Sequence, residues 1–285
     1  MRAASTPTPA PPDLLNVEGL TIAFSADGPA AVRDVSFRMG RERLAVVGES
    51  GSGKSVLFRS LLRLLPGSAR VQARRLDFAG TDLQAASPAA IRRLRGRRIG
   101  FILQDPHHAL HPTQTLGAQI AEMLRLTQGL ARRAAWERTL ALLDEVRIAR
   151  PAQAARLYPH QVSGGMGQRA MIAMALAGEP ELLIADEATS ALDAVVRHEI
   201  LALIDAAVEQ RGMGLVLISH DLDLVARHAD RVLVMYQGRL LETLAATRLN
   251  DAAHPYTRGL LACRPALAHI GRELPTLQRS DAWLA

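Results

Sequence analysis

The sequence predicts an α/β fold built around a mostly parallel β-sheet. Two short segments, LLIAD at 182–186 and LVLIS at 215–219, are apolar along their whole length and flank a helical pattern from about 195 to 210. Strands buried on both faces in this way are typical of parallel sheets that helices cover. A third observation is the glycine-rich segment GESGSGKS at 48–55, which lies between an apolar strand and a helical pattern.

The N-terminal half is expected to begin with antiparallel strands. The segments LLNVEGLTIAF at 14–24 and AVRDVSFRM at 31–39 alternate apolar and polar residues, as half-buried strands do, and a turn with Gly and Pro separates them. The apolar strand RLAVVGE at 43–49 follows. The next segment, KSVLFRSLLRLL at 54–65, is helix-periodic until a Pro-Gly pair ends it.

The C-terminal half alternates between helical and strand patterns. Residues from about 115 to 178 are predominantly helix-periodic, and the two apolar strands come after them. The segment RVLVMYQGRLLE at 231–242 predicts a hairpin, and a helical stretch completes the chain. Neither an internal repeat nor a heptad array is present in the sequence.

Composition indicates a folded cytoplasmic protein. The chain has 285 residues, 48% of them hydrophobic, which is enough for a full core. No window approaches the roughly 20 consecutive apolar residues of a membrane-spanning helix. The first twelve residues, MRAASTPTPAPP, lack the apolar region of a secretory signal and are expected to form a disordered tail. The single cysteine, Cys263, permits no internal disulfide, which fits a reducing compartment.

Charge leaves several partner classes open. The net charge of +6 is compatible with nucleic acid, an anionic membrane surface or a phosphorylated ligand. The one tight basic run, RRLRGRR at 92–98, has no aromatic residues between its arginines for base stacking. We interpret this run as a solvated basic face, and we expect no nucleic-acid partner.

The segment at 48–55 predicts a phosphate-binding site. It fits the pattern G-x-x-x-x-G-K-[ST], in which glycines turn backbone N–H groups toward nucleotide phosphates at the start of a helix. Lys54, the only lysine in the chain, would reach the β- and γ-phosphates, and the Ser55 hydroxyl would bind Mg²⁺. The residues expected to bind the nucleotide are Gly48, Glu49, Ser50, Gly51, Ser52, Gly53, Lys54, Ser55 and Val56.

Two carboxylates are expected near these phosphates. Asp186 and Glu187 follow a buried strand, and open α/β sheets bind ligands at the carboxyl ends of their strands. Asp186 suits Mg²⁺, and Glu187 suits the polarisation of an attacking water. A guanine-specific GTPase would need an Asn-Lys-x-Asp motif, and the chain has no second lysine to supply it.

Further motifs resemble those of one family, the nucleotide-binding subunits of ABC transporters. VSGGMGQR at 162–169 resembles the signature motif of that family and precedes the LLIADE strand in the order that the family requires. Gln104 in FILQDP resembles the Q-loop, SALD at 190–193 the D-loop, and His220 in LISHD the switch histidine. The resemblance extends from about residue 14 to near the C-terminus.

This resemblance implies roles for residues outside the phosphate loop. Gln104 would contact Mg²⁺ or the attacking water, His220 would contact the γ-phosphate, and Asp193 would lie at a dimer interface. Phe24 takes the place of the aromatic residue that stacks on adenine. The signature would complete the ATP site of a partner subunit in trans, through Ser163, Gly164, Gly165 and Met166.

The resemblance narrows to the oligopeptide, dipeptide and nickel importer branch. SGGM followed by MIAMAL resembles the first of the two paired ATPases of that branch, and HPYTRGLL at 254–261 is also similar to the branch. No chemistry can be derived for HPYTRGLL, and Pro255 at a helix start explains its shape equally well. With Cys263 as the only cysteine, an iron–sulfur centre is not expected.

These expectations define an ATP-hydrolysing importer subunit. The expected domains are a tail at 1–12, an ABC ATPase domain at 13–250 with a helical subdomain at about 105–178, and a helical extension at 251–285. ATP and Mg²⁺ are the expected cofactors. The expected partners are a second ATPase subunit, in a homodimer or a heterodimer, two permeases that hold the chain at the cytoplasmic face of the inner membrane, and an extracytoplasmic solute-binding protein.

Three alternatives stay open from the sequence. The solute is expected to be a peptide, but nickel or a metallophore suits the same branch. A soluble ABC-type ATPase acting on DNA or ribosomes is disfavoured, because the chain has one cassette and a short helical insert. His107, His108 and His111 are interpreted as solvated or partner-facing, since no cysteine or carboxylate accompanies them at ligand spacing.

Overall fold

The computed structural model describes residues 13–25, 28–190 and 192–264, and the single residues 277, 280 and 283. The predicted tail at 1–12 lies outside the described residues, as does most of the predicted extension after residue 264. Among the described residues, no helix combines the length and the apolar character that crossing a membrane requires.

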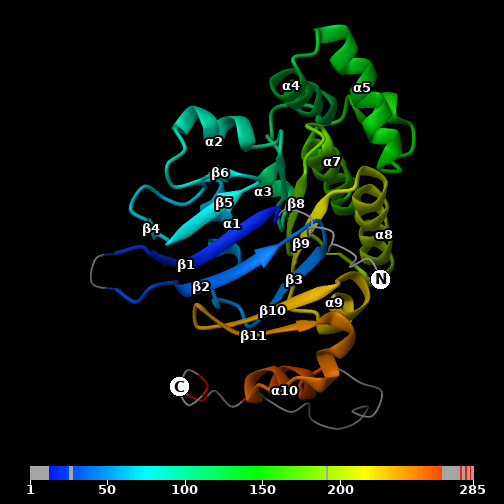
Figure 1. The fold of residues 1–285 in the computed structure, drawn as a ribbon. Helices are drawn as coiled ribbons and strands as arrows, with labels where there is room; N and C mark the ends of the chain where they lie inside the picture. The colour runs from blue at the N-terminus through cyan, green and yellow to red at the C-terminus, as the bar shows by residue number, and fades with distance from the viewer. Residues whose placement is uncertain are drawn as a thin grey trace, which may run out of the picture.

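A mostly parallel sheet forms the centre of the molecule (Figure 1). Within the described residues it has six strands in the order β11-β10-β3-β9-β8-β7. The pairs from β10 to β7 are parallel, and β11 pairs antiparallel with β10 as the predicted hairpin. The strands are β3 (Arg43–Val47), β7 (Ile99–Ile102), β8 (Leu182–Asp186), β9 (Gly214–Ile218), β10 (Arg231–Tyr236) and β11 (Arg239–Ala245).

A second sheet, antiparallel, is built from N-terminal segments. Its strands run in the order β2-β1-β5-β6, and β4 also pairs with β1. The alternation of apolar and polar residues that predicted β1 and β2 appears as alternating buried and exposed side chains along β2. The strands are β1 (Leu15–Ala23), β2 (Val32–Met39), β4 (Arg70–Gln72), β5 (Arg75–Phe78) and β6 (Thr81–Asp82).

The helices differ in position as well as in length. In Figure 1, α4, α5 and α7 lie together at one end of the molecule, and α10 lies at the opposite end. The α-helices are α1 (Lys54–Leu61), α2 (Pro88–Leu94), α3 (Pro106–Ala109), α4 (Leu116–Gln128), α5 (Arg132–Glu145), α6 (Pro151–Ala154), α7 (Gly164–Leu176), α8 (Ala194–Arg211), α9 (Leu222–His228) and α10 (Pro255–Ala262). Two 3₁₀ helices, η1 (Pro159–Gln161) and η2 (Ala246–Asp251), complete the set in the described chain.

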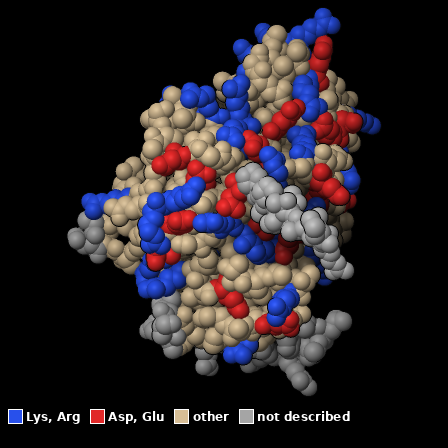
Figure 2. All heavy atoms as spheres, viewed as in Figure 1, with Lys and Arg blue, Asp and Glu red and all other residues tan. Residues whose placement is uncertain are grey.

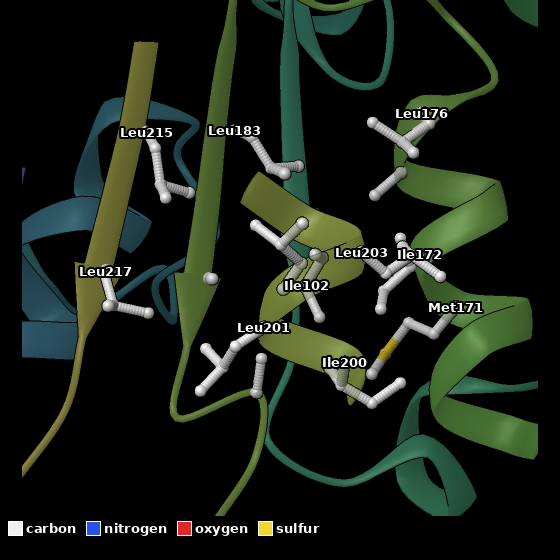
Figure 3. Close-up of a cluster of buried hydrophobic side chains, with 14 of the residues drawn as sticks. Ile102, Met171, Ile172, Leu176, Leu183, Ile200, Leu201, Leu203, Leu215 and Leu217 are labelled. Atoms are coloured by element: carbon white, nitrogen blue, oxygen red, sulfur yellow. The ribbon is translucent and has the colours of Figure 1, made fainter. Parts of the chain in front are cut away.

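The core sheet separates two hydrophobic cores, because successive side chains of a strand point to opposite faces. Leu44 and Val46 of β3 belong to the core shared with α1 and the antiparallel sheet, whereas Ala45 and Val47 belong to the core under α7 and α8. Figure 3 shows part of the second core, where labelled side chains of α7, α8, β7, β8 and β9 meet. Burial on both faces explains why β8 and β9 are apolar throughout.

The predicted fold class is confirmed, with one interpretation corrected. The parallel core sheet, the antiparallel N-terminal strands and the helical stretch all occur as expected. The basic run at 92–98 is not simply a solvated face, because several of its arginines are tied to the fold. Arg95 donates to the backbone carbonyls of Leu62 and Arg63, and Arg98 pairs with Glu181.

Candidate functional site

The loop at 48–55 leaves the middle of the core sheet. It connects β3, which lies between β10 and β9, to the start of α1. Gly48 has φ +147°, and a Cβ atom on it would lie 2.0 Å from the carbonyl oxygen of Met235. Gly53 has φ +97°, and its Cβ would lie 2.4 Å from the carbonyl oxygen of Ala31. Both positions therefore need glycine, so the loop conformation is fixed by its neighbours.

Lys54 folds back onto this loop. Its side chain is buried, and Nζ donates hydrogen bonds of 2.8 Å to the carbonyl oxygens of both Gly48 and Glu49. A longer bond of 3.3 Å reaches Oγ of Ser52. Burial lowers the pKa of the ammonium, and the nearby carboxylates of Glu187, Asp186 and Glu49 offset part of that effect.

A buried carboxylate faces the first turn of α1. Asp186, the last residue of β8, is 2% exposed and accepts a hydrogen bond of 2.6 Å from Oγ of Ser55. Nη2 of Arg59, one turn further along α1, lies 2.9 Å from the other carboxylate oxygen of Asp186. Ser55 and Arg59 thus hold Asp186 from one face of the helix. The contribution of Arg59 was not predicted.

Glu187 and His220 meet beside Asp186. Glu187 has a left-handed backbone, φ +48°, and its N–H donates to the carbonyl oxygen of Ile218 at 3.0 Å. Nδ1 of His220 lies 3.6 Å from Oε1 of Glu187. Because a non-glycine residue rarely adopts this conformation, the turn after β8 directs the Glu187 side chain at some conformational cost.

Strand register explains why these residues converge. Val46 of β3 pairs with Ile218 of β9, Ile218 pairs with Asp186 of β8, and Ala185 pairs with Ile102 of β7. The carboxyl ends of these strands are therefore level, and the loops that follow them share one edge of the sheet. Gln104 lies at the same edge, two residues after β7, with an exposed side chain that forms no hydrogen bond with the described residues.

The segment after Gln104 begins a short helix. Asp105 caps α3 by accepting the backbone N–H of His107, and this bond, with further help from His108, lowers the pKa of the Asp105 carboxyl. His108 contacts Asp105, and His111 contacts Thr113. Within the described chain, no group of three histidine, cysteine or acidic side chains is arranged to hold a metal ion.

The signature residues lie at the start of α7. Ser163 caps this helix by accepting the N–H of Met166 at 3.3 Å, and both Ser163 and Gly164 are exposed. A Cβ on Gly165 would lie 3.0 Å from the side chain of Val196, so the starts of α7 and α8 are packed closely. The structure thus brings the signature beside the first turn of α8, which Asp193 caps, while the Ser163 side chain bonds within its own turn.

Asp193 and Phe24 lie at the edges of this arrangement. Asp193 is exposed and caps α8 through hydrogen bonds of 3.0 Å from the N–H groups of Val195 and Val196. Phe24 follows β1 and is 37% exposed. Ala31, whose carbonyl oxygen lies against Gly53, donates its N–H to the carbonyl oxygen of Ile22, two residues before Phe24.

Of the remaining predicted nucleotide-binding residues, Ser50 and Gly51 are exposed at the tip of the loop. Val56 is partly buried against the core between α1 and the antiparallel sheet. A cavity of about 440 Å³ borders Gly48, Glu49 and His220. A larger one, about 960 Å³, lies between α4 and α5 and contains none of the predicted residues, so chemistry rather than size locates the site.

A family model and the similar proteins found by sequence agree with one another. A family model described as "ABC transporter" matches residues 32–190. A putative peptide import ATP-binding protein of Brucella abortus (strain 2308) is 45% identical over 278 residues, which cover 94% of this chain and 82% of that protein. The glutathione import ATP-binding protein GsiA of Salmonella typhimurium is 47% identical over 274 residues, which cover 92% of this chain but 44% of GsiA.

Solved structures share the fold. The structure of cbiO1 from Clostridium perfringens, described as part of the ABC transporter complex cbiONQ, has a TM-score of 0.73 and 26% identity, covering 91% of this chain and 97% of that one. A dimeric ATP-binding cassette, MJ0796, bound to ADP and Pi, has a TM-score of 0.71, covering 81% of this chain and 98% of that one. At 22% identity, the second likeness shows the fold alone.

Proposed function

The chain belongs to the ABC transporter family as an ATP-hydrolysing subunit, and we propose that it powers the uptake of peptides through separate permease subunits. The observation that carries this proposal is the convergence of Lys54, Ser55, Asp186, Glu187 and His220 at one edge of the core sheet. These are the groups that phosphoryl transfer from ATP to water requires. Relatives named as peptide and glutathione importers support the choice of solute.

The phosphate loop binds ATP in this proposal. The glycine-rich turn presents backbone N–H groups, and the N-terminus of α1 adds its partial positive charge. Lys54 exchanges the carbonyl oxygens of Gly48 and Glu49 for the β- and γ-phosphates. Phe24 stacks on the adenine ring, since it is a partly exposed aromatic residue directly after β1, and β1 bonds to the Ala31 segment that borders Gly53.

The oxygen ligands present fit Mg²⁺. The Ser55 hydroxyl and the buried Asp186 carboxylate are hard donors that already lie 2.6 Å apart, and the amide oxygen of Gln104 follows the adjacent strand end. When bound, Mg²⁺ neutralises charge on the β- and γ-phosphate oxygens. Arg59, whose Nη2 lies 2.9 Å from the second carboxylate oxygen of Asp186, holds this carboxylate in its orientation.

Glu187 and His220 act in the attack of water on the γ-phosphate. Glu187 orients and polarises the attacking water as general base, because its left-handed turn aims the carboxylate from the sheet edge. His220, 3.6 Å from that carboxylate, contacts the γ-phosphate. Proximity of the two side chains lets one group position the nucleophile while the other positions the phosphoryl group.

One chain supplies half of each ATP site. Ser163 and Gly164 are exposed at the start of α7, where helix N–H groups form an anion site that is open apart from the Ser163 cap among the described residues. A second ATPase subunit, paired head to tail, brings its own signature helix to the γ-phosphate; in a dimer of identical chains, the residues are Ser163, Gly164, Gly165 and Met166. Asp193, at the start of α8 beside this helix, lies at the subunit interface.

The transport partners follow from the proposed role. The chain sits at the cytoplasmic face of the inner membrane through two permeases, and an extracytoplasmic binding protein delivers the solute. The face seen in Figure 2 intersperses acidic with basic side chains, which favours protein partners over a nucleic-acid backbone. Nickel or a metallophore is the alternative solute, since the ATP site contacts no solute in either case.

The proposal can be tested in cells by replacing Glu187 with Gln in the chromosomal gene. Uptake of a labelled di- or tripeptide should fall to background, while the purified variant still binds ATP. Glu137→Gln is the matched control, because Glu137 lies on the exposed face of α5 in a pair with Arg133. Loss of labelled Ni²⁺ uptake with normal peptide uptake would favour the nickel alternative, and normal uptake of both would refute the proposal.

A further inference from the structure

The HPYTRGLL segment is anchored to the core sheet by one carboxylate. Glu242 of β11 accepts the backbone N–H groups of Ala253 and His254 and the hydroxyl of Thr257. His254 caps the helix by accepting the N–H of Tyr256 at 3.1 Å. These bonds fix the start of α10 against β11, so the helix has one defined position on the ATPase domain.

Tyr256 connects α10 to the phosphate loop. Its side chain is fully buried and packs against Tyr236 and Trp283, with ring centroids 4.6 and 5.3 Å away. Its hydroxyl accepts a hydrogen bond of 2.9 Å from the backbone N–H of Glu49. Tyr256 is 207 positions from Glu49 in the sequence, so this contact forms only when the C-terminal segment is folded onto the ATPase domain.

The peptide group between Gly48 and Glu49, which bonds to Tyr256, also bonds to Lys54. The carbonyl oxygens of Gly48 and Glu49 both accept hydrogen bonds from Nζ of Lys54. The Glu49 N–H belongs to the peptide group whose carbonyl is that of Gly48. A bond to this N–H therefore fixes the orientation of the carbonyl that Lys54 contacts, and with it the first limb of the phosphate loop.

The contact between α10 and the loop is concentrated at Tyr256. Beside it lies a cavity of about 440 Å³, bordered by Glu49 on one side and by Leu260 and Cys263 on the other. Further along, Arg264 contacts Asp223 in the first turn of α9, three residues after His220. Among the described residues, the hydroxyl of Tyr256 links α10 directly to the phosphate loop.

We propose that Tyr256 is a positioning residue for ATP binding, which holds the first limb of the phosphate loop through the Glu49 N–H. The proposal rests on the assignment of ATP to the Lys54 loop. It gives the HPYTRGLL segment a physical role, because a preorganised loop loses less conformational freedom when it closes on phosphates. Tyr256 itself contacts neither nucleotide nor metal in this account.

The test compares Tyr256→Phe with Tyr236→Phe in the full-length chain. Both variants remove one hydroxyl from the same buried aromatic cluster, but the hydroxyl of Tyr236 bonds to its neighbour Gln237 rather than to the loop. We expect Tyr256→Phe to raise the Kd for ATP, by calorimetry, and the KM of hydrolysis about three- to tenfold, from the loss of one hydrogen bond. The loss should appear in KM more than in kcat, and Tyr236→Phe should match the wild type.

A second variant separates the hydrogen bond from packing. Glu49→Pro removes the N–H donor, so in that background Tyr256→Phe should cause no further rise in Kd. Equal effects of the two tyrosine variants, an unchanged Kd in Tyr256→Phe, or additive effects with Glu49→Pro would overturn the inference. A wild-type chain that fails to bind ATP would instead refute the proposed function, so the two failures are distinguishable.

Discussion

At the residue scale, Lys54 permits a direct physical measurement because it is the only lysine in the chain. Burial lowers the pKa of its ammonium, although Glu187, Asp186 and Glu49 lie close enough to offset part of this effect. Nucleotide phosphates would add negative charge beside the ammonium and so favour its protonated form. The protonation of one side chain therefore reports on the phosphate site.

We expect the pKa of Lys54 to be lower in the folded chain than in the urea-unfolded chain. Binding of ADP to the folded chain should raise this pKa. A sample isotopically labelled only at lysine gives one side-chain signal by NMR, and its pH titration measures the pKa without assignment. The unfolded sample serves as the control. A folded-state pKa equal to the unfolded one, or one that ADP leaves unchanged, would contradict this account of the site.

The same shift predicts how stability depends on pH. Because the folded-state pKa of Lys54 is below its unfolded value, the unfolded chain binds more protons between the two values, and the free energy of unfolding rises with pH there. This window lies just below about pH 10.4. Lys54→Met lacks the rise, so urea unfolding should show the wild type gaining stability relative to the variant as pH increases. A constant difference would contradict it.

Residues near Lys54 show what the sequence could and could not predict. The phosphate loop, Asp186, Glu187 and His220 were predictable because motif spacing and strand ends place them at one sheet edge. Arg59 was not, because one arginine among many carries no signal until α1 is seen to face Asp186. The same arginine-rich background hid the backbone contacts of Arg95, although Arg92, Arg93 and Arg97 of the basic run are exposed as interpreted.

At the scale of elements, long periodic segments were predictable and short ones were not. The helices α4 and α8 bury one face over several turns, which leaves a periodic signal. The helix α7 is buried on most sides, and its long apolar run predicts it instead. The strands β4 and β6 have three and two residues, too few to show alternation, and they are held by pairing with β1 and β5. Such segments depend on partners that are distant in sequence, so local patterns cannot reveal them.

The start of α10 depends on Glu242, and this contact predicts sensitivity to acid. Burial alone would raise the pKa of the Glu242 carboxyl, but hydrogen bonds from Thr257, Ala253 and His254 lower it overall. Stability from this group is thus present above the unfolded pKa of about 4.3 and is lost as pH falls through the lower folded value.

We expect Glu242→Gln to lower the free energy of unfolding by about 1–2 kcal/mol at neutral pH, because the ionised acceptor of these bonds is lost. The difference from the wild type should shrink as the solution is acidified below about pH 4. Urea unfolding followed by tryptophan fluorescence measures both quantities. Glu209→Gln, on the exposed face of α8, is the control. A difference that persists unchanged in acid would show that the carboxylate charge does not anchor α10.

At the scale of the whole molecule, the phosphate loop and the signature belong to different layers. Lys54 begins α1 beneath the antiparallel sheet, whereas Ser163 begins α7, which packs with α3, α4, α5 and α8 on the other face of the core sheet. A rigid chain cannot bring its own Ser163 to the phosphates at Lys54 through contacts of these helices. In the proposed head-to-tail pairing of two subunits, each would contribute the half that the other lacks.

This geometry predicts complementation between inactive variants. Lys54→Ala disables the phosphate loop and Ser163→Arg disables the signature, so each variant alone should lack ATPase activity. Mixed dimers of the two contain one site with both lesions and one intact site, and an equal mixture should recover about a quarter of the wild-type activity. Lys54→Ala mixed with Glu187→Gln is the control, because both lesions fall on the same half and no mixed site is intact. If light scattering showed mixed dimers of Lys54→Ala and Ser163→Arg without recovered turnover, the composite site would be wrong.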